Sequence, residues 1–150
     1  MSQALTLRLP DEDAEEVRRI ARKERRSVSD VTARIVDEWL RLNRFPQIEF
    51  RSVNGERIAC IKGRLELWQV IMVAQGHGGD VAQTAEHLNL RRDQVQAALN
   101  YHAAYPAEID SALAENSQGF DRLRRLLPQI ERTNITDEDL ARVHLAASPP

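Results

Sequence analysis

Several features that would narrow the function of a chain are scarce or absent in these 150 residues. Cys60 is the one cysteine, so no disulfide can form within the chain, and we expect a reducing compartment and a buried structural thiol. No run of 18 or more apolar residues is present, and residues 1–10 lack the apolar stretch of a signal peptide. We therefore expect a cytoplasmic protein without membrane association, built from one or two small domains.

The residue patterns of common enzymes and metal sites are missing as well. His77, His87, His102 and His144 show no ligand spacing with cysteine or carboxylate, and "GHGGD" lacks the Lys-Ser/Thr of a phosphate loop. Cys60 has no evident catalytic histidine partner. The sequence therefore predicts no enzyme, no metal site and no cofactor.

What is present begins with "ALTLRLP", residues 4–10, in which apolar and polar side chains alternate up to a proline. Successive side chains of a strand face opposite sides, so this alternation predicts a short strand with one apolar face. The apolar face holds Leu5, Leu7 and Leu9, and the opposite face holds Ala4, Thr6 and Arg8.

Two amphipathic helices are expected after this strand. Pro10 suits the first position of a helix, and the acidic run that follows it favours the positive helix end. The apolar positions of the two helices are Ala14, Val17, Ile20 and Ala21, then Val28, Val31, Ile35, Trp39 and Leu42. The break between them is Arg25-Arg26-Ser27, with Ser29 as the expected N-cap of the second helix and Ser27 as the alternative.

The first 44 residues offer no second strand with which the first could pair. Unpaired backbone groups on a strand edge are normally covered or paired, and so short a segment buries little apolar surface by itself. A second copy of the chain would remedy both deficits, through an antiparallel two-stranded ribbon over a four-helix core. We therefore expect a homodimer formed through the N-terminal strand.

The combination of "LTLRLP", a charged helix, "RRSVSD" and a helix lined by Val, Ile and Trp resembles the ribbon-helix-helix DNA-binding family, to which the MetJ and Arc repressors belong. The resemblance covers residues 4–43. It implies that the ribbon enters the major groove of double-stranded operator DNA and that the second helix begins at a phosphate. The residues implied in DNA binding are Ala4, Thr6, Arg8, Arg26, Ser27, Val28 and Ser29.

A simpler interpretation is that Thr6 and Arg8 form the wet face of an ordinary strand, although that leaves the missing strand partner unexplained. Most arginines of the first helix alternate with glutamates and are expected to form a solvated, paired face. Residues 1–44 carry 10 Lys/Arg against 9 Asp/Glu, whereas residues 45–150 carry 11 against 14. DNA binding would therefore be local and strongly salt-dependent.

A second module follows residues 45–46. Asn54-Gly55 between two short apolar runs predicts a β-hairpin over residues 48–61. Helices are then expected from Leu65 to the "GHGG" sequence, over residues 81–88, over residues 92–104 and from Pro106 onward. Of these, "AQTAEHLNLRRDQVQAAL" resembles a helix-turn-helix, and the hairpin beside it suggests a winged variant.

The helix-turn-helix resemblance implies a possible second DNA-binding surface, made of Arg91, Arg92, Gln94, Gln96 and Asn100. The alternative, left open, is that this helical hairpin is a scaffold or a dimer contact. Residues 48–110 also resemble a small domain of VapB-type antitoxins, whose partners are PIN-like ribonuclease toxins. Its most specific pieces are the Gly-Arg then Trp-Gln-Val-Ile start of a helix and the close "VQAALNYHAAYPAEID".

After Asn116-Ser117-Gln118-Gly119 the composition changes to an apolar stripe interrupted by Pro128, followed by a last short helix that begins near Thr136 and Asp139 and runs through Leu140, Val143 and Ala147. These segments could pack back on the domain or lie across a partner. By analogy with antitoxins, an arginine here would neutralise the acidic site of a PIN-type toxin. The candidate residues are Arg122, Arg124 and Arg125.

The expected fold is mainly α with a short β-ribbon: a ribbon-helix-helix dimer over residues 1–44, a winged helix-turn-helix-like domain over 45–118 and a partner-binding tail over 119–150. The expected function is that of an antitoxin in a type II toxin-antitoxin system, a DNA-binding autorepressor that neutralises a PIN-like toxin. The alternatives are a stand-alone dimeric repressor or plasmid-partition regulator, and an interaction scaffold without a role in DNA binding.

Overall fold

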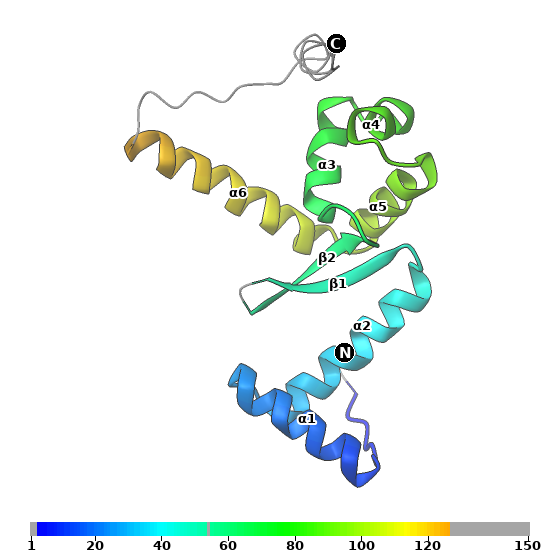
Figure 1. Ribbon diagram of the computed structural model, residues 1–150, viewed down its shortest axis with the longest axis vertical. Helices are drawn as coiled ribbons and strands as arrows, with labels where there is room; N and C mark the ends of the chain where they lie inside the picture. The colour runs from blue at the N-terminus through cyan, green and yellow to red at the C-terminus, as the bar shows by residue number, and fades with distance from the viewer. Residues whose placement is uncertain (1–2, 54, 127–150) are drawn as a thin grey trace, which may run out of the picture. The chain divides into compact units, whose positions relative to one another are not determined.

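The computed structural model describes residues 3–53 and 55–126 of the chain (Figure 1). In this part the chain is mainly helical, as expected, with one two-stranded antiparallel sheet. The elements are α1 (Asp11–Glu24), α2 (Val28–Arg44), β1 (Ile48–Val53), β2 (Glu56–Ile61), α3 (Leu67–Gly76), α4 (Val81–Leu88), α5 (Arg92–Ala104) and α6 (Pro106–Leu126). None of the helices in these residues combines the length and the apolar character needed to cross a bilayer.

Two compact units make up the chain, Met1–Ser111 and Ala112–Pro150. The first contains every element up to α5 together with the start of α6, and α6 continues into the second. No helix end separates residues 116–119 from what precedes them, although the sequence suggested a change of module there. The segments expected around Pro128, Thr136, Asp139, Leu140, Val143 and Ala147 lie outside the described residues.

The helices α1 and α2 form where the sequence predicted two amphipathic helices. Pro10 is the N-cap of α1 rather than its first helical residue, and three acidic side chains occupy the first turn. Arg25 ends α1 in the left-handed conformation, with φ 55°. Ala21 and Val31 are buried where α1 and α2 pack together.

The predicted N-cap of α2 at Ser29 is wrong, and the alternative, Ser27, is correct. The Ser27 hydroxyl accepts a 3.0 Å hydrogen bond from the backbone N–H of Asp30, which is the bond an N-cap makes. Arg25 ends α1 in the left-handed conformation, and α2 begins three residues later, at Val28. Ser29 therefore lies inside the first turn of α2.

The predicted hairpin is confirmed for its described residues. β1 and β2 pair in antiparallel register from Ile48 opposite Ile61 to Val53 opposite Glu56. Gly55 has φ +85°, a conformation that the turn requires and that side chains disfavour. The end of the hairpin away from the turn is apolar and buried, and Cys60 is fully enclosed there as expected.

The helices α3, α4 and α5 pack on one another and, through α3, on β2. The bounds of α4 and α5 match the predicted segments, and α3 begins at Leu67, two residues after its predicted start at Leu65. Asn89 makes the left-handed turn between α4 and α5 with φ 50°. The core of this part is apolar, with Thr84 as its one buried polar side chain among the described residues, and its hydroxyl donates to the carbonyl of Asp80 at 2.6 Å. The buried residues of α3 to α5 are Leu67, Val70, Ile71, Ala74, Thr84, Ala85, Val95, Ala98 and Tyr101.

Candidate nucleic-acid interface

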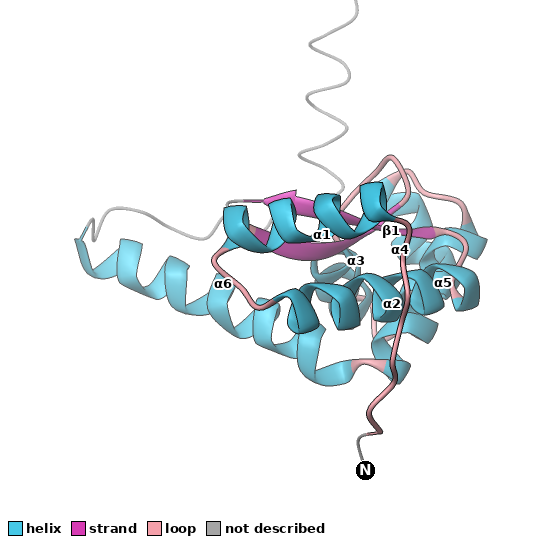
Figure 2. Cartoon of the chain, turned by 90° about the horizontal axis from the view of Figure 1, so that it is seen from below, coloured by secondary structure: helices cyan, strands magenta, loops and turns pink. Residues whose placement is uncertain are grey.

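The N-terminal segment, residues 3–9, leads into α1 as a loop and pairs with no strand in residues 3–53 and 55–126 (Figure 2). The predicted strand was to pair with a second copy, which a single chain does not contain, so it stays a prediction. The leucines of its apolar face are open to solvent: Leu5 is 90% exposed, Leu7 57% and Leu9 38%. Ala4, Thr6 and Arg8 are also exposed.

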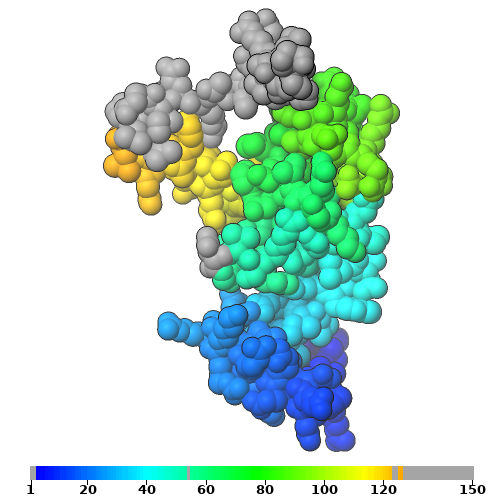
Figure 3. Space-filling model, in the orientation of Figure 1, coloured from blue at the N-terminus to red at the C-terminus, as the bar shows by residue number. Residues whose placement is uncertain are grey.

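A groove of about 340 Å³ lies between this segment and the two helices behind it. Its residues come from the segment and the start of α1, from the middle of α1 and from the first half of α2 (Figure 3 shows these elements in blue and cyan). Apolar side chains dominate the lining, with one carboxylate and one guanidinium among them. The lining residues are Leu7, Leu9, Asp11, Ala14, Val17, Arg18, Val28 and Thr32.

The turn between α1 and α2 gathers basic side chains beside the start of α2. Lys23, Arg25 and Arg26 are exposed and make no side-chain hydrogen bond or ion pair within the described residues. The other arginines of α1 are paired as expected, with Arg18 and Arg22 on Glu15 and Arg19 on Glu16. The hydrogen bond from Arg22 and then that from Arg18 lower the pKa of Glu15.

The first backbone N–H groups of α2 lie next to this basic turn. Ser27 satisfies the N–H of Asp30, and those of Val28 and Ser29 have no hydrogen-bond partner in the described part of the chain. Two free N–H groups at the positive end of a helix favour an anion. The predicted phosphate-binding residues Val28 and Ser29 thus keep free N–H groups at this helix end.

The helix-turn-helix residues are mostly occupied by contacts within the chain. The Arg91 guanidinium forms 3.0 Å contacts with Asp93, and the Gln94 side chain accepts from the backbone N–H of Arg91 at 3.0 Å. Gln96 donates to Asn100 one turn further on. Arg92 is exposed and has neither a hydrogen bond nor an ion pair among the described residues.

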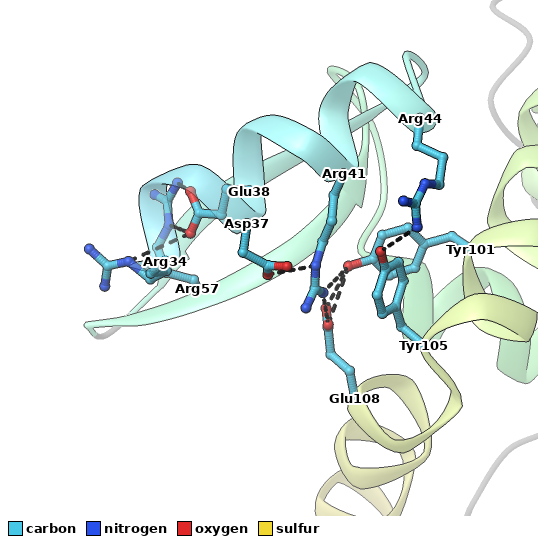
Figure 4. A network of polar contacts seen from close by, with 9 residues as sticks. All are labelled: Arg34, Asp37, Glu38, Arg41, Arg44, Arg57, Tyr101, Tyr105 and Glu108. Carbon is cyan, nitrogen blue, oxygen red and sulfur yellow. Dashed lines mark hydrogen bonds and ion pairs between the residues drawn. The ribbon is translucent and has the colours of Figure 1, made fainter. Parts of the chain in front are cut away.

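An arginine network fixes the end of α2 against α5 and α6 (Figure 4). The Arg41 guanidinium contacts Asp37 at 2.7 Å and Glu108 at 2.5 Å, and donates to the Tyr101 hydroxyl at 2.9 Å. It also lies 4.0 Å from the centre of the Tyr105 ring, a cation–π contact. Burial raises the pKa of Tyr101, which also donates to Glu108 at 3.0 Å.

A second set of ion pairs joins α1, α2 and the hairpin. Arg34 binds Glu24 at 2.6 Å and lies 3.7 Å from Glu38, which in turn binds Arg57 of β2 at 2.6 Å. The hydrogen bond from Arg34 lowers the pKa of Glu24. The polar face of α2 is therefore engaged with its own chain along most of its length.

The remaining predicted site residues lie on α6. Arg122 and Arg125 are exposed and without a hydrogen bond or ion pair in the described residues, and the side chain of Arg124 lies outside them. Leu126, at the end of α6, is 72% exposed.

Sequence reasoning missed two clusters. One is the arginine network, because contacts over 60 to 67 positions, such as Arg41 with Tyr101 and Glu108, leave no local pattern. The other is a histidine pair, His77 Nε2 and His87 Nδ1 at 3.1 Å, formed where α3 and α4 pack. No group of three or more His, Cys, Asp or Glu side chains suited to a metal ion occurs in the described part.

Comparison of this chain with protein-family models, with curated proteins and with solved structures finds no match.

Proposed function

We propose that this protein is a dimeric DNA-binding repressor of the antitoxin type, in which residues 3–44, here called the N-terminal module, read the operator. The observation that carries the proposal is the exposed leucine face of a segment with no strand partner among the described residues, immediately before two helices that meet at a basic turn. A second copy would supply the missing strand and cover the leucines.

If residues 4–9 pair with the same residues of a second chain, the alternation of side chains determines what each face of the ribbon contacts. The leucines would turn toward the helices, and the opposite side chains would turn outward into the major groove. Arg8 would then reach the O6 and N7 atoms of guanine, which is the commonest base-specific contact. Thr6 offers a hydroxyl, and Ala4 only a methyl group, so we expect Arg8 to carry most of the discrimination.

Phosphate contacts would orient this ribbon on the duplex. The free N–H groups of Val28 and Ser29, with Arg26 beside them, form a site for one phosphate in each subunit. Lys23 and Arg25 add unpaired positive charge on the same turn. The excess of exposed, uncommitted cations in the N-terminal module supports its role as the DNA reader, although the chain as a whole has a net charge of −2.

The helix-turn-helix module has fewer uncommitted cations for DNA binding than the N-terminal module, among the described residues. Of the cations in residues 45–111, Arg51, Arg57, Arg64 and Arg91 are bonded to groups of their own chain, which leaves Lys62 and Arg92. Gln94 and Gln96, the two glutamines of its predicted DNA-binding surface, make contacts within α5 and at its start. We therefore assign residues 48–104 a scaffolding or protein-binding role, which favours one of the two interpretations that the sequence left open.

The decisive experiment compares Arg8→Ala with Arg92→Ala in binding to the DNA upstream of the gene, by fluorescence anisotropy at fixed salt. Arg8→Ala should weaken specific binding by about 1–3 kcal/mol, or about 5- to 150-fold, because a bidentate base contact is lost. Arg92→Ala is the matched control, since it removes an equally exposed, unpaired arginine from the other module, and it should bind like the parent. A reversed order would assign DNA reading to α5.

The antitoxin part of the proposal is supported by α6. The distal end of α6 presents Arg122 and Arg125, two exposed cations without an ion pair in the described part of the chain, and the apolar side chain of Leu126. Such a surface suits an acidic site flanked by apolar side chains, as in a PIN-like ribonuclease.

A pull-down tests this part. The chain is co-expressed with the product of any adjoining toxin-sized reading frame, as parent and as the double variant Arg122→Glu, Arg125→Glu. We expect the variant to capture clearly less toxin while still binding DNA, because the reversed charges repel an acidic site. Undiminished capture would remove these arginines from the mechanism, and no capture by the parent would favour the stand-alone repressor.

A further inference from the structure

Two histidine side chains meet where α3 ends and α4 packs against it. The Nε2 atom of His77 and the Nδ1 atom of His87 lie 3.1 Å apart, and the ring planes are inclined at 68° to one another. His77 is half-buried and His87 is exposed. The pair is therefore accessible to small solutes, and the function proposed above makes no use of it.

The backbone holds both histidines in defined positions. His77 is the C-cap of α3, and its N–H group donates to carbonyls of the last turn at 3.1 and 3.2 Å. Gly78 and Gly79 follow with φ +62° and +85°, left-handed conformations that reverse the direction of the chain. Asp80 then caps α4, and His87 lies in the last turn of that helix. Because both ends are closed by hydrogen bonds, only side-chain rotation is needed to adjust the two rings.

The distance between the two nitrogens suits a shared metal ion. Imidazole nitrogens bind Zn²⁺ at about 2.0–2.1 Å, so two of them in a tetrahedral site lie about 3.3–3.4 Å apart. The observed distance of 3.1 Å is about 0.2–0.3 Å shorter, a difference that small rotations of the rings supply. A hydrogen bond between the rings would explain the same distance, so the choice depends on the protons and charges around the pair.

The nitrogens on the far side of each ring leave the required protonation state open. For both facing nitrogens to offer a lone pair, His77 must carry its proton on Nδ1 and His87 on Nε2. Neither of these two atoms has a hydrogen-bond partner within residues 3–53 and 55–126. Nothing in that part of the chain therefore opposes the tautomers that a metal ion needs.

The charges carried by these two helices favour a cation. Residues 67–88 contain no Lys or Arg, and their two acidic residues are Asp80 and Glu86. Both are exposed and form no ion pair among the described residues. The guanidinium of Arg64 reaches the far end of α4, where it is bound to the carbonyl of Asn89. A divalent ion at the histidine pair would thus meet no basic side chain from α3 or α4.

We propose that His77 and His87 form a two-ligand site for a divalent transition metal ion such as Zn²⁺, which would clip the end of α3 to the last turn of α4. Imidazole suits Zn²⁺, Cu²⁺ and Ni²⁺, whereas Mg²⁺ and Ca²⁺ take oxygen ligands. Water would fill the remaining positions, so we expect weaker binding than at a structural zinc site with four protein ligands. The inference depends neither on DNA binding nor on the proposed dimer.

Titration of the metal-free, untagged full-length chain with ZnCl₂ tests the site. Two-dimensional NMR of the histidine rings reports on each of the four histidines separately. We expect saturable binding of one Zn²⁺ per chain, with shifts of the His77 and His87 rings and none of His102 or His144. MgCl₂ at the same concentrations should shift no ring.

Glutamine variants separate a metal site from a hydrogen bond. Glutamine keeps a donor and an acceptor at the pair, but its amide is a poor ligand for Zn²⁺. His77→Gln and His87→Gln should therefore each weaken Zn²⁺ binding at least about 10-fold, since even the loss of a group that only supports a ligand costs that much. His102→Gln is the matched control: it removes a histidine whose Nε2 lies 2.7 Å from Asp110, and Zn²⁺ binding should be unchanged.

Thermal unfolding gives an independent readout. Zn²⁺ should raise the unfolding midpoint of the parent and of His102→Gln, because the ion binds the folded chain, and should leave those of the other two variants nearly unchanged. Absence of saturable binding, shifts on other histidine rings, or full affinity in either variant would overturn the site and leave the pair as a hydrogen bond. The NMR titration uses the parent chain, so it decides the matter even if a variant loses its fold. Since DNA binding is measured separately, failure here would leave the proposed function standing.

Discussion

Ser27 determines where α2 begins and, with it, which N–H groups are free for an anion. Its hydroxyl accepts a hydrogen bond from the N–H of Asp30, and the N–H groups of Val28 and Ser29 have no acceptor among the described residues. The sequence "RRSVSD" allowed either serine as the cap, since both precede apolar residues at helical spacing. The left-handed conformation of Arg25 ends α1 early enough for Ser27 to be the cap. Residue types alone do not predict this conformation for an arginine.

The two serines therefore differ in their expected effect on stability. Ser27→Ala should lower the free energy of unfolding by about 1 kcal/mol, because the Asp30 N–H loses its acceptor. Ser29→Ala should change it little, since Ser29 lies within the first turn and caps nothing among the described residues. Urea unfolding followed by circular dichroism measures both, and a larger loss for Ser29→Ala would reassign the cap.

Burial lowers the reactivity that we expect of the Cys60 thiol. The thiol is fully enclosed, and desolvation raises its pKa. Because the thiolate is the reactive form, we expect this cysteine to react slowly with thiol reagents in the folded chain.

At the scale of elements, α2 is the helix whose polar side chains bind α1, β2, α5 and α6 through ion pairs and hydrogen bonds. One face carries Arg34, Glu38 and Arg41, each paired with another element of the same chain. The rest of its surface carries exposed apolar side chains, Trp39 and Leu40 among them. The sequence showed that α2 is amphipathic. Its periodic pattern did not show that the polar side would make many of the contacts of α2 with its own chain.

Arg41 should be the most sensitive polar position on that helix. Arg41→Met keeps the apolar stem but leaves Asp37, Glu108 and Tyr101 without their cation, and we expect a loss of about 2–3 kcal/mol in unfolding free energy. Glu108 is partly exposed, so the loss stays below that of a fully enclosed pair. The measurement is urea unfolding at neutral pH.

Arg44→Met is the control for that variant. Arg44 makes one exposed 3.3 Å hydrogen bond to the Tyr105 hydroxyl, so its loss should cost no more than about 0.5 kcal/mol. Equal losses for the two variants would mean that the network around Arg41 contributes no more than a surface contact.

At the scale of the whole molecule, the sequence predicted the helices and the hairpin well, because local periodicity, the glycine turn and proline mark them. The strands β1 and β2 and the helix α5 fold as expected. What local pattern could not supply is the set of distant contacts, including the arginine network, the histidine pair and the groove. The dimer itself depends on a second chain, so the strand at residues 4–9 is a prediction about an assembly.

The uncovered backbone of residues 3–9 has a consequence for turnover. These residues make no backbone hydrogen bond to the described part of the chain, and Leu5 among them is 90% exposed, so a protease could engage the stretch without first unfolding any helix or strand. Assembly would hide it. The cellular lifetime of the polypeptide would then follow its abundance, with surplus single chains degraded first and paired ones spared.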